Sequence, residues 1–549
     1  MSLLKKELQN KIKGDVLIDE VTIETYSRDA SLFYVRPQAV VFPKDKNDVV
    51  NIIKYVTEKK KEGMDISVSG RSAGTDIGGG SLTESIVMVF TKYMNHMLEV
   101  NKDFAIAETG MYYKDFEKQT LKHKWLMPSY PASRDLCALG GIISNNSGGE
   151  KTLTYGKTEK YIKETEVVFA NGETDIIKSL NKRELEEKMR ENTESGRIHK
   201  EIFNLITKNE DVINKNKPTV TKNSSGYYIW NVYDEEKGIF DLNKLIVGSQ
   251  GTLAMVTSAK ITGVTPKKHS RMLVIFLKSF KDLGDIVPAL LKHKPETIES
   301  YDDHTFKIAM KFLPEIIQKM GGNFLTLGFK FIPEAIAVLT GGVPKLILMA
   351  EWVGDDEDEL KRIVQIAHDD MKRFPSEKRM IEDEKEAKKY WTFRRESFNL
   401  LRKKLKGFRT APTVDDLCVH AKDLPEYLPK LQAIFDKYNF IYSIQGHVGD
   451  ANFHVYPLID VEQKNVMKDL YQMMDEAYDL TFSYKGSMSG EHNDGILRTP
   501  YLEKMFGKEM NDIFKDIKNI FDPQNILNPG KKVNGTLEYA FSHIDKRKV

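Results

Sequence analysis

Cysteine is almost absent from this 549-residue chain, which has only Cys137 and Cys418. Two cysteines so far apart in sequence cannot build a disulfide framework. They also cannot supply the four thiolates that an iron–sulfur cluster usually needs. The chain therefore carries no cysteine-ligated redox centre of its own. So few cysteines are typical of a reducing compartment, and we expect a cytoplasmic protein.

Long hydrophobic runs and an excess of one charge are also missing. No run of about eighteen apolar residues occurs, so no transmembrane segment is expected. The first fifteen residues contain Glu7 and lack the apolar core of a secretory signal. The 82 basic and 80 acidic residues leave a net charge of only +2, which gives no reason to expect nucleic acid or a strongly anionic membrane as a partner.

Short apolar runs alternate with helical patterns in the first third of the chain. Strands are predicted at residues 39–42, 66–68 and 86–90, with a helix at 48–59. This order predicts an α+β or α/β nucleotide-binding unit. Residues 179–245 are more polar and are interpreted as an insertion. A strand at 272–277 opens a second region after a boundary near Pro266.

A glycine-rich segment, VSGRSAGTDIGGG at residues 68–80, follows the second predicted strand. Glycine lets the backbone approach a ligand closely, so successive N–H groups can point at phosphate oxygens. The segment lacks the GxGxxG spacing, and Gly156-Lys157-Thr158 fails the Walker pattern because Lys151 stands where the first glycine is needed. Alone, the segment is as typical of a mobile loop as of a pyrophosphate loop.

Two more glycine-rich segments follow in the sequence. Residues 131–158 cluster glycines around Asn145 and Asn146, which suits close packing against a flat, hydrogen-bonding ring system. Residues 247–257, VGSQGTLAMVT, form the third segment. Each segment is weak evidence on its own, whereas the three together indicate a bound cofactor with a phosphate group.

With these three segments in this order, the chain resembles the vanillyl-alcohol oxidase/p-cresol methylhydroxylase (PCMH) flavoproteins. Within them it is most similar to the branch of D-lactate dehydrogenase, D-2-hydroxyglutarate dehydrogenase and the glycolate oxidase large subunit, from about Tyr26 to Val533. The resemblance implies an α+β fold, with a two-subdomain PCMH-type FAD-binding domain and an α+β cap domain that has an antiparallel sheet. It divides the chain into an N-terminal helical lead-in (1–30), the FAD-binding domain (31–266, with the insertion at about 179–245), the cap or substrate domain (267–500) and a C-terminal return to the FAD domain (501–549).

The resemblance also implies which residues hold FAD. Around the pyrophosphate they are Ser69, Gly70, Arg71, Ser72, Ala73, Gly74 and Thr75. Along the flavin and ribityl chain they are Pro131, Ala132, Ser133, Gly140, Gly141, Ser144, Asn145, Gly148 and Gly149. Gly248, Gly251 and Thr252 close the site, and Asn528 is assigned either to the isoalloxazine edge or to a structural turn. Gln250 departs from the family, which usually has glutamate there. Because no histidine or cysteine lies in residues 68–80, we expect non-covalent FAD.

Two histidine-containing motifs lie in the second half of the chain. GHVGDANFH contains His447 and His454, separated by turn-forming residues that would bring the two imidazoles together, and SGEHNDG places Glu491 beside His492. Two imidazoles and a carboxylate suit a divalent transition metal such as zinc. A lone histidine is more often a hydrogen-bonded structural residue, and that interpretation stays open for each.

The resemblance assigns roles to these side chains. His447, His454 and Glu491 would hold the metal, Asn452 would contact the substrate and His492 would be the base. In the oxidation of R–CH(OH)–COO⁻, a hydride passes to flavin N5 and the hydroxyl proton to His492.

Two neighbouring arginines are candidates for the substrate carboxylate. Arg394 in WTFRRES matches the carboxylate-binding arginine of the family, although Arg394 and Arg395 also fit a solvated pair on a helix. A further family lysine is missing from the stretch TAPTVDD, which puts recognition of a second carboxylate in doubt, and Arg409 is the hypothetical substitute.

The predicted function is FAD-dependent oxidation of a D-2-hydroxy acid, D-lactate or D-2-hydroxyglutarate, to the 2-oxo acid, with an acceptor other than NAD. Larger relatives carry a fused iron–sulfur domain, so we expect electrons to leave through a quinone, an electron-transfer protein or a separate iron–sulfur subunit. The oligomeric state is open, a dimer included. One alternative is a non-catalytic flavin-binding subunit of a glycolate-oxidase-like complex. Another, an ether-lipid synthase of the same fold, is disfavoured because no two histidines are adjacent.

Overall fold

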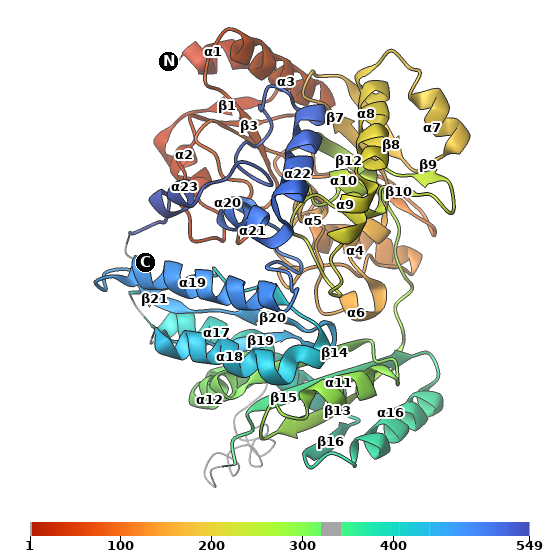
Figure 1. The fold of residues 1–549 in the computed structure, drawn as a ribbon, viewed down its shortest axis with the longest axis vertical. Coiled ribbons are helices and arrows are strands. Elements are labelled where there is room, and N and C mark those ends of the chain that lie inside the picture. The colour runs from red at the N-terminus through yellow and green to blue at the C-terminus, as the bar shows by residue number, and fades with distance from the viewer. Residues whose placement is uncertain (1–2, 320–341, 406, 439, 548–549) are drawn as a thin grey trace.

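The structure, a computed structural model, describes residues 3–319, 342–405, 407–438 and 440–547. Two bodies lie one above the other in Figure 1, the N-terminal half above and a large antiparallel sheet with its helices below. The last segment of the chain returns to the upper body (Figure 1). Along the described residues, none of the helices combines the length and the apolar character needed to span a bilayer.

The first sheet of the upper body has the strand order β1-β2-β4-β3, with β2, β4 and β3 parallel. Its strands are β1 (Asp15–Leu17), β2 (Ala39–Phe42), β3 (Val68–Arg71) and β4 (Ile86–Val89). Helix α3 (Lys46–Lys61) buries one apolar face against this sheet. The strands predicted at 39–42 and 86–90 and the helix at 48–59 are confirmed within two residues. The strand predicted at 66–68 instead begins at Val68, because the amide of Ser67 donates to the Ser85 hydroxyl.

The second sheet of the upper body is antiparallel, in the order β5-β6-β12-β7-β8. Its strands are β5 (Met97–Val100), β6 (Ala105–Glu108), β7 (Ile162–Val168), β8 (Thr174–Lys178) and β12 (Met255–Ile261). The short helices α5 (Leu139–Asn145) and α6 (Thr152–Tyr155) lie in the glycine-rich connection between β6 and β7. Two sheets of different type thus frame the glycine-rich loops.

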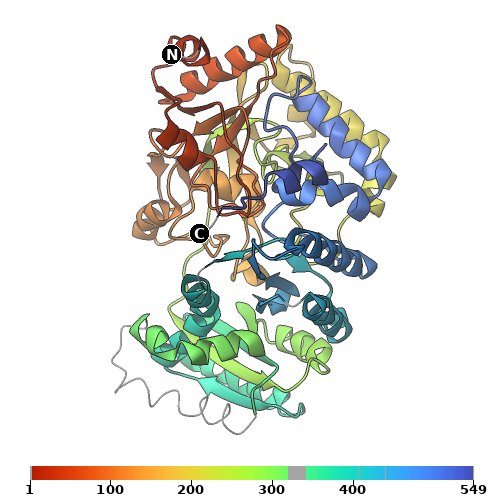
Figure 2. The ribbon, with the colours of Figure 1, turned by 90° about the vertical axis from the view of Figure 1, so that its left-hand side faces the viewer.

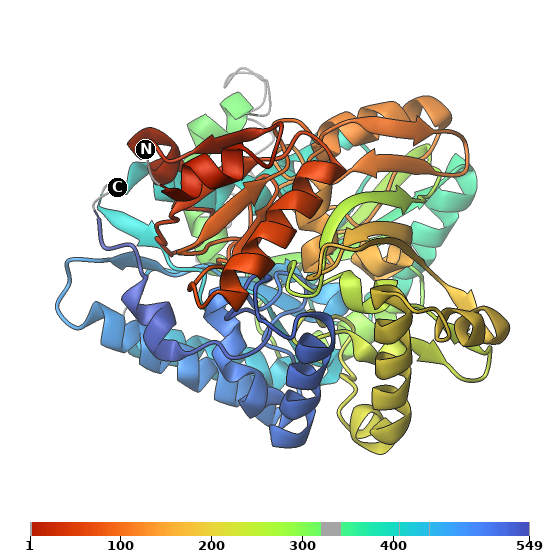
Figure 3. The same cartoon turned by 90° about the horizontal axis from the view of Figure 1, so that it is seen from above.

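The polar region after β8 folds into a helical unit with a small sheet. It contains α7 (Lys182–Lys188), α8 (Glu194–Lys208), α9 (Glu210–Lys215), α10 (Asn243–Ile246) and the strands β9 (Leu180–Asn181), β10 (Tyr233–Asp234) and β11 (Ile239–Phe240). Ile198, Ile202 and Ile206 form the buried face of α8, the spacing expected of an amphipathic helix. This helix packs against α22 (Lys508–Phe521), as the view from above shows (Figure 3).

The lower body, which we call the cap, is built on a seven-stranded sheet in the order β16-β13-β15-β14-β19-β20-β18. The strands are β13 (His269–Leu277), β14 (Thr297–Asp302), β15 (Leu346–Gly354), β16 (Glu377–Ile381), β18 (Leu417–Cys418), β19 (Ile444–His447) and β20 (Asn452–Val455). β17 (Phe408–Thr410) and β21 (Leu458–Asp460) form a separate pair. The neighbouring strands of this sheet pair antiparallel, as predicted for the cap.

Helices cover both faces of the cap sheet (Figure 2). Alternate residues of β13 enter different cores: Leu273 and Ile275 pack with α11 (Leu283–Leu291), α16 (Glu357–Met371) and α18 (Leu424–Lys437), whereas Met272 and Val274 pack with α12 (Asp303–Lys311), α13 (Leu313–Lys319) and α17 (Glu384–Lys404). Because successive side chains of a strand point to opposite faces, a continuous apolar run such as 272–277 indicates a sheet buried on both sides.

The C-terminal segment joins the upper body next to the first glycine-rich loop. After α19 (Val466–Ser483) come α20 (Gly495–Arg498), α21 (Leu502–Phe506), α22 and α23 (Leu537–Ser542). Between α22 and α23, Leu527 bridges Val68 of β3 in parallel. The Val68 amide donates to Ile526 O at 2.8 Å, and the Asn528 amide donates to Val68 O at 2.9 Å. The N-terminal helices α1 (Leu3–Gln9), α2 (Glu20–Tyr26) and α4 (Tyr113–Thr120) complete this body.

Candidate functional site

A single cavity collects the three glycine-rich segments. It encloses about 1360 Å³ of space, part of it open to solvent. Of the twenty residues predicted to hold the cofactor, fifteen line it: Gly70, Arg71, Ser72, Ala73, Gly74, Thr75, Pro131, Ala132, Ser133, Gly140, Gly141, Ser144, Asn145, Gly148 and Gly251. Segments more than a hundred residues apart in sequence therefore form one wall.

The first loop offers free backbone donors to this cavity. Gly78 and Gly80 are already engaged, because their amides donate to Asp76 Oδ2 at 3.2 and 2.6 Å. Within the described residues, the amides of residues 72–76 donate no hydrogen bond to the chain. A run of unpaired N–H groups is an anion-binding concavity, and the Arg71 side chain lies on the same wall. The cradle fits a pyrophosphate at residues 72–76 rather than at the three consecutive glycines.

The other five predicted cofactor residues lie behind the cavity wall. Ser69, Gly149, Gly248 and Thr252 do not line it, and Asn528 is fully buried. The side-chain nitrogen of Asn528 (Nδ2) donates to Gly80 O and Gln250 O at 2.7 Å each. Its side-chain oxygen (Oδ1) accepts from the Ser69 hydroxyl at 2.7 Å. Asn528 thus links the first and third glycine-rich segments, and its assignment to the isoalloxazine edge stays a prediction.

Sequence reasoning missed part of the lining. The additional residues are Asp76, Ile77, Gly80, Ser81, Phe90, Thr109, Cys137, Ala138, Ile142, Ser147, Gln250, Ala254, Met255, Val256 and Tyr456. Most of them lie within the three glycine-rich segments but are not glycines or small polar residues, so the motif did not single them out, whereas Ser81, Phe90, Thr109 and Tyr456 lie outside the segments. Tyr456 had a signal: it lies two residues after His454, so an extended backbone puts both side chains on the same face. Their rings stack at 6.2 Å.

Two imidazoles converge on one carboxylate at the cap side of the cavity. The Nε2 atoms of His447 and His454 lie 3.1 and 3.3 Å from Glu491 Oε1. Their Nδ1 atoms are engaged elsewhere, His447 with Glu299 Oε1 at 2.6 Å and His454 with Asp415 O at 2.7 Å. This leaves both Nε2 lone pairs directed at the same point. Metal-binding histidines are oriented in this way by hydrogen bonds at the other nitrogen, so the three residues fit a metal ion.

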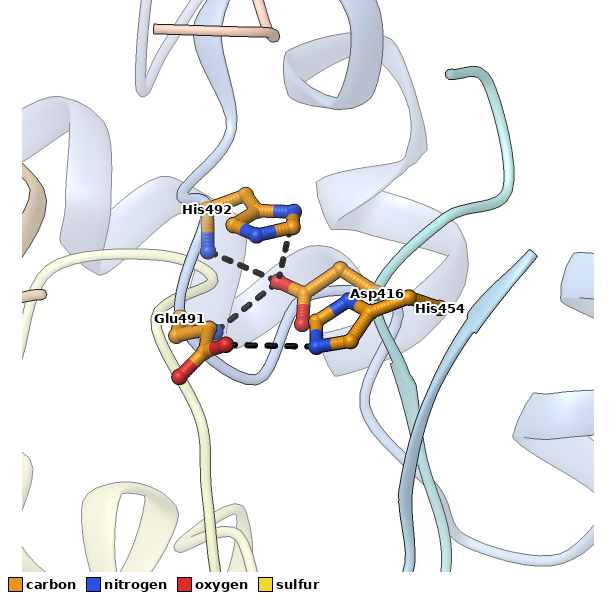
Figure 4. A group of neighbouring side chains, drawn as sticks. All are labelled: Asp416, His454, Glu491 and His492. Atoms are coloured by element: carbon orange, nitrogen blue, oxygen red, sulfur yellow. Dashed lines mark hydrogen bonds and ion pairs between the residues drawn. The ribbon is translucent and has the colours of Figure 1, made fainter. Parts of the chain in front are cut away.

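A second set of possible ligands overlaps the first. One ligand atom each from Asp416, His454, Glu491 and His492 lies within 4.8 Å of the others, and Figure 4 shows these side chains pointing toward one another. The Asp416 oxygens are already used, however. Oδ1 accepts from Asn452 Nδ2 at 3.0 Å, and Oδ2 accepts from the Ser489 hydroxyl and two backbone amides. The chemistry of the donors therefore favours His447 over Asp416 as the third ligand.

The predicted substrate residue Asn452 is fully buried behind the cluster. Its Nδ2 donates to Asp416 Oδ1 and to Leu417 O at 3.2 Å, and it does not line the cavity, whereas Tyr456 does. The structure places Asn452 beside Asp416, with its Oδ1 buried and without a hydrogen-bond partner among the described residues, and the substrate contact stays a prediction.

His492 lines the cavity next to Glu491. Its Nδ1 lies 3.2 Å from Asp415 Oδ2, and Asp415 in turn forms a buried ion pair with Arg498. Burial alone would lower the pKa of His492, but Asp416 and Asp415 raise it to about 9. A ring that acts as a base must be neutral, so positive charge brought into this site would favour that role.

Lys222, from the polar insertion, is a functional neighbour that no motif indicated. It is fully buried, and its Nζ lies 3.2 Å from Asp450 Oδ2 and 3.5 Å from Glu491 Oε2. Burial would raise the pKa of Glu491, yet Lys222 and His447 hold it well below its usual range. The lysine thus keeps Glu491 ionised, with Oε1 turned to the two imidazoles.

The three candidate arginines have different partners. Arg394 is buried, with one guanidinium nitrogen 2.5 Å from Glu299 Oε2. Arg395 pairs with Glu150 at 2.5 Å and lies over the Trp391 ring, which links α17 to the upper body. Arg409 donates to Asp545 O at 2.6 Å. The Arg409 guanidinium is committed to the C-terminal segment, which argues against it as a second carboxylate site.

Two family models match the chain. The FAD binding domain matches residues 37–176, and the C-terminal domain of FAD linked oxidases matches residues 266–532. Among solved structures, p-cresol methylhydroxylase with substrate bound is similar in fold, with a TM-score of 0.67 at 14% identity over 97% of this chain and 96% of that one.

Curated relatives are similar over nearly the whole chain. D-2-hydroxyglutarate dehydrogenase of Haemophilus influenzae is 27% identical over 94% of this chain but only 50% of its own length. Glycolate oxidase subunit GlcD of Bacillus subtilis is 27% identical over 92% of this chain and 91% of its own. D-lactate dehydrogenase of Anaerostipes hadrus is 24% identical over 94% of each. The chain thus spans about half the length of the D-2-hydroxyglutarate dehydrogenase. With both domains and this fold, the chain belongs to the FAD-linked oxidases, flavoenzymes with the PCMH-type FAD-binding fold.

Proposed function

We propose that the chain oxidises a D-2-hydroxy acid to the 2-oxo acid, with non-covalent FAD in the cavity and a divalent metal, zinc by its ligand type, at His447, His454 and Glu491. The observation that carries the proposal is the convergence of the two Nε2 atoms on Glu491, which lines the cavity formed by the glycine-rich segments. The names of the curated relatives, D-2-hydroxyglutarate dehydrogenase and D-lactate dehydrogenase, support the substrate class.

Different residues of the chain have different roles in the proposed reaction. When bound, FAD supplies a hydride acceptor and the metal a Lewis acid for the substrate hydroxyl. Arg394 attracts the substrate carboxylate, His492 takes the hydroxyl proton at its free ring nitrogen, and Asp415 orients that ring from the other side. Tyr456 forms part of the wall beside them and limits the room for the substrate side chain.

Non-covalent attachment is supported by the state of the nearest thiol. Cys137 lines the cavity, but burial raises the pKa of its thiol to about 12. The thiolate is the nucleophilic form, so this cysteine is a poor partner for a flavin adduct. Extraction of the purified protein with acid or detergent should release the whole of the yellow chromophore.

Anaerobic reduction of the flavin tests the function. Metal-replete protein is mixed with D- and L-enantiomers of lactate, 2-hydroxybutyrate and 2-hydroxyglutarate, and bleaching of the flavin band is followed. We expect D-enantiomers of these acids to bleach the flavin band. We expect His492→Ala to keep FAD bound while flavin reduction becomes about 10²–10⁴-fold slower. If no hydroxy acid reduces the flavin, the chain is better described as a non-catalytic flavin-binding subunit.

A further inference from the structure

Glu299 is a fully buried carboxylate that touches two parts of the site at once. Its Oε1 lies 2.6 Å from His447 Nδ1, and its Oε2 lies 2.5 Å from an Arg394 guanidinium nitrogen. The Thr297 hydroxyl donates to Oε1 at 3.0 Å. One oxygen of the Glu299 carboxylate thus contacts His447, the proposed metal ligand, and the other contacts Arg394.

The fold explains why these groups meet. β14 pairs antiparallel with β19, with Ser300 opposite Gly446 and Tyr301 opposite Gln445, so the register continues toward Glu299 and His447. Tyr301 lies on the same face of β14 as Glu299, and its ring meets that of Phe393 at 6.5 Å. This contact positions α17 so that the next residue, Arg394, reaches Glu299.

The carboxylate of Glu299 faces two donors. Its two oxygens lie against the Arg394 guanidinium and the His447 imidazole, and an ionised carboxylate can accept from both donors. The corresponding amide has one acceptor and one donor. A glutamine in this place could therefore accept from His447 or from Arg394, and its N–H₂ would face the other donor.

We propose that Glu299 is a positioning residue shared by the metal site and the substrate-carboxylate site, so that metal affinity and substrate affinity depend on the same carboxylate. It orients the ring of His447 so that Nε2 faces Glu491, and it holds the buried guanidinium of Arg394, whose Nε has no hydrogen-bond partner among the described residues. The proposal rests on the function proposed above for the assignment of Arg394, whereas the contact with His447 stands without it.

Glu299→Gln in the FAD-loaded protein tests the shared role. Zinc affinity is measured without substrate by competition with a chromophoric chelator, and KM and kcat are measured at saturating zinc. We expect zinc affinity to fall by about 10–100-fold. We also expect KM to rise by about tenfold or more because Arg394 is no longer held, with kcat changed much less. Glu351→Gln, a carboxylate-to-amide change on the adjacent strand β15, is the control and should alter neither quantity.

Arg394→Met probes the same link from the other side and does not depend on the folding of the first variant. Without the guanidinium, the negative charge of Glu299 is no longer shared with Arg394 and interacts with His447 alone. Zinc should then bind about fivefold tighter or more, although Arg394 is not a ligand. Lys151→Met, which removes a lysine paired with Glu296, is the matched control.

The outcomes separate the two proposals. Unchanged zinc affinity in both Glu299→Gln and Arg394→Met overturns the shared role, as does a fall in zinc affinity with an unchanged KM. If Glu299→Gln loses zinc but no hydroxy acid reduces the parent flavin, the proposed function fails and the shared role is reduced to the support of His447.

Discussion

Glu351 of β15 provides a pH-dependent test of the junction between the cap and the upper body. Burial raises the pKa of its carboxyl from 4.5 to about 7, with Glu296 and Glu150 contributing in the same direction. Glu150 belongs to the glycine-rich connection and Glu296 precedes β14, so the three carboxyls meet where the two bodies join. The raised pKa means that the folded protein prefers the protonated form.

The size of the effect follows from this shift. A change of about 2.5 pKa units corresponds to about 3 kcal/mol. Because the folded pKa lies above the unfolded one, this stabilisation is fully present below about pH 4.5 and is lost as the pH rises through about 7. Glu351→Gln is neutral at every pH, so its free energy of unfolding relative to the parent should rise by about 2.5 kcal/mol between pH 5 and pH 8.

Urea unfolding at the two pH values measures this difference. Trp352 is buried beside Glu351 and provides a fluorescence signal from the cap. The comparison uses parent and variant with FAD bound, so the titration of groups that do not interact with Glu351 cancels in the double difference. The same stability gap at pH 5 and pH 8 would refute the reasoning, because it would mean that Glu351 titrates alike in the folded and unfolded chain.

Two further predictions concern packing around the site. Lys222→Met leaves Asp450 and Glu491 without their buried counter-charge. In urea titration of the metal-free protein, the free energy of unfolding should fall by about 3–5 kcal/mol. A loss below about 1 kcal/mol would contradict the buried ion pair. A Cβ on Gly149 would lie 2.3 Å from Tyr130 O, so Gly149→Ala should displace the wall at Pro131 and lower the ratio of flavin to protein absorbance. Gly354→Ala, where the nearest atom would lie 3.7 Å away, should retain FAD as the parent does, and equal retention by both variants would contradict the argument.

Local pattern predicted much of the framework. The apolar run at 272–277 and the helical spacing at 48–59 are each visible within a single segment. These two elements could therefore be predicted without knowledge of the residues that pack against them. The histidine motifs were similarly local, because a strand–turn–strand brings its own two imidazoles together.

The residues that support the site were not predictable in this way. Lys222 and Asp416 lie in separate connections and Glu299 lies in β14, and the three contact residues 36 to 269 positions away. An isolated lysine or carboxylate has the same appearance in sequence whether it is solvated or buried against a ligand. Asn452 lies between the two histidines of its motif, and its side-chain nitrogen donates to Asp416, a contact that the motif did not indicate.

The parallel bridge of Leu527 to Val68 has a consequence for the order of biosynthesis. The sheet that presents the first glycine-rich loop gains its contact with Leu527 only after the whole cap has been synthesised. Asn528, which braces Ser69, Gly80 and Gln250, arrives at the same late moment. The cap therefore emerges from the ribosome before the domain that carries the glycine-rich loops has all of its contacts, and that domain is completed only after Asn528 has been synthesised.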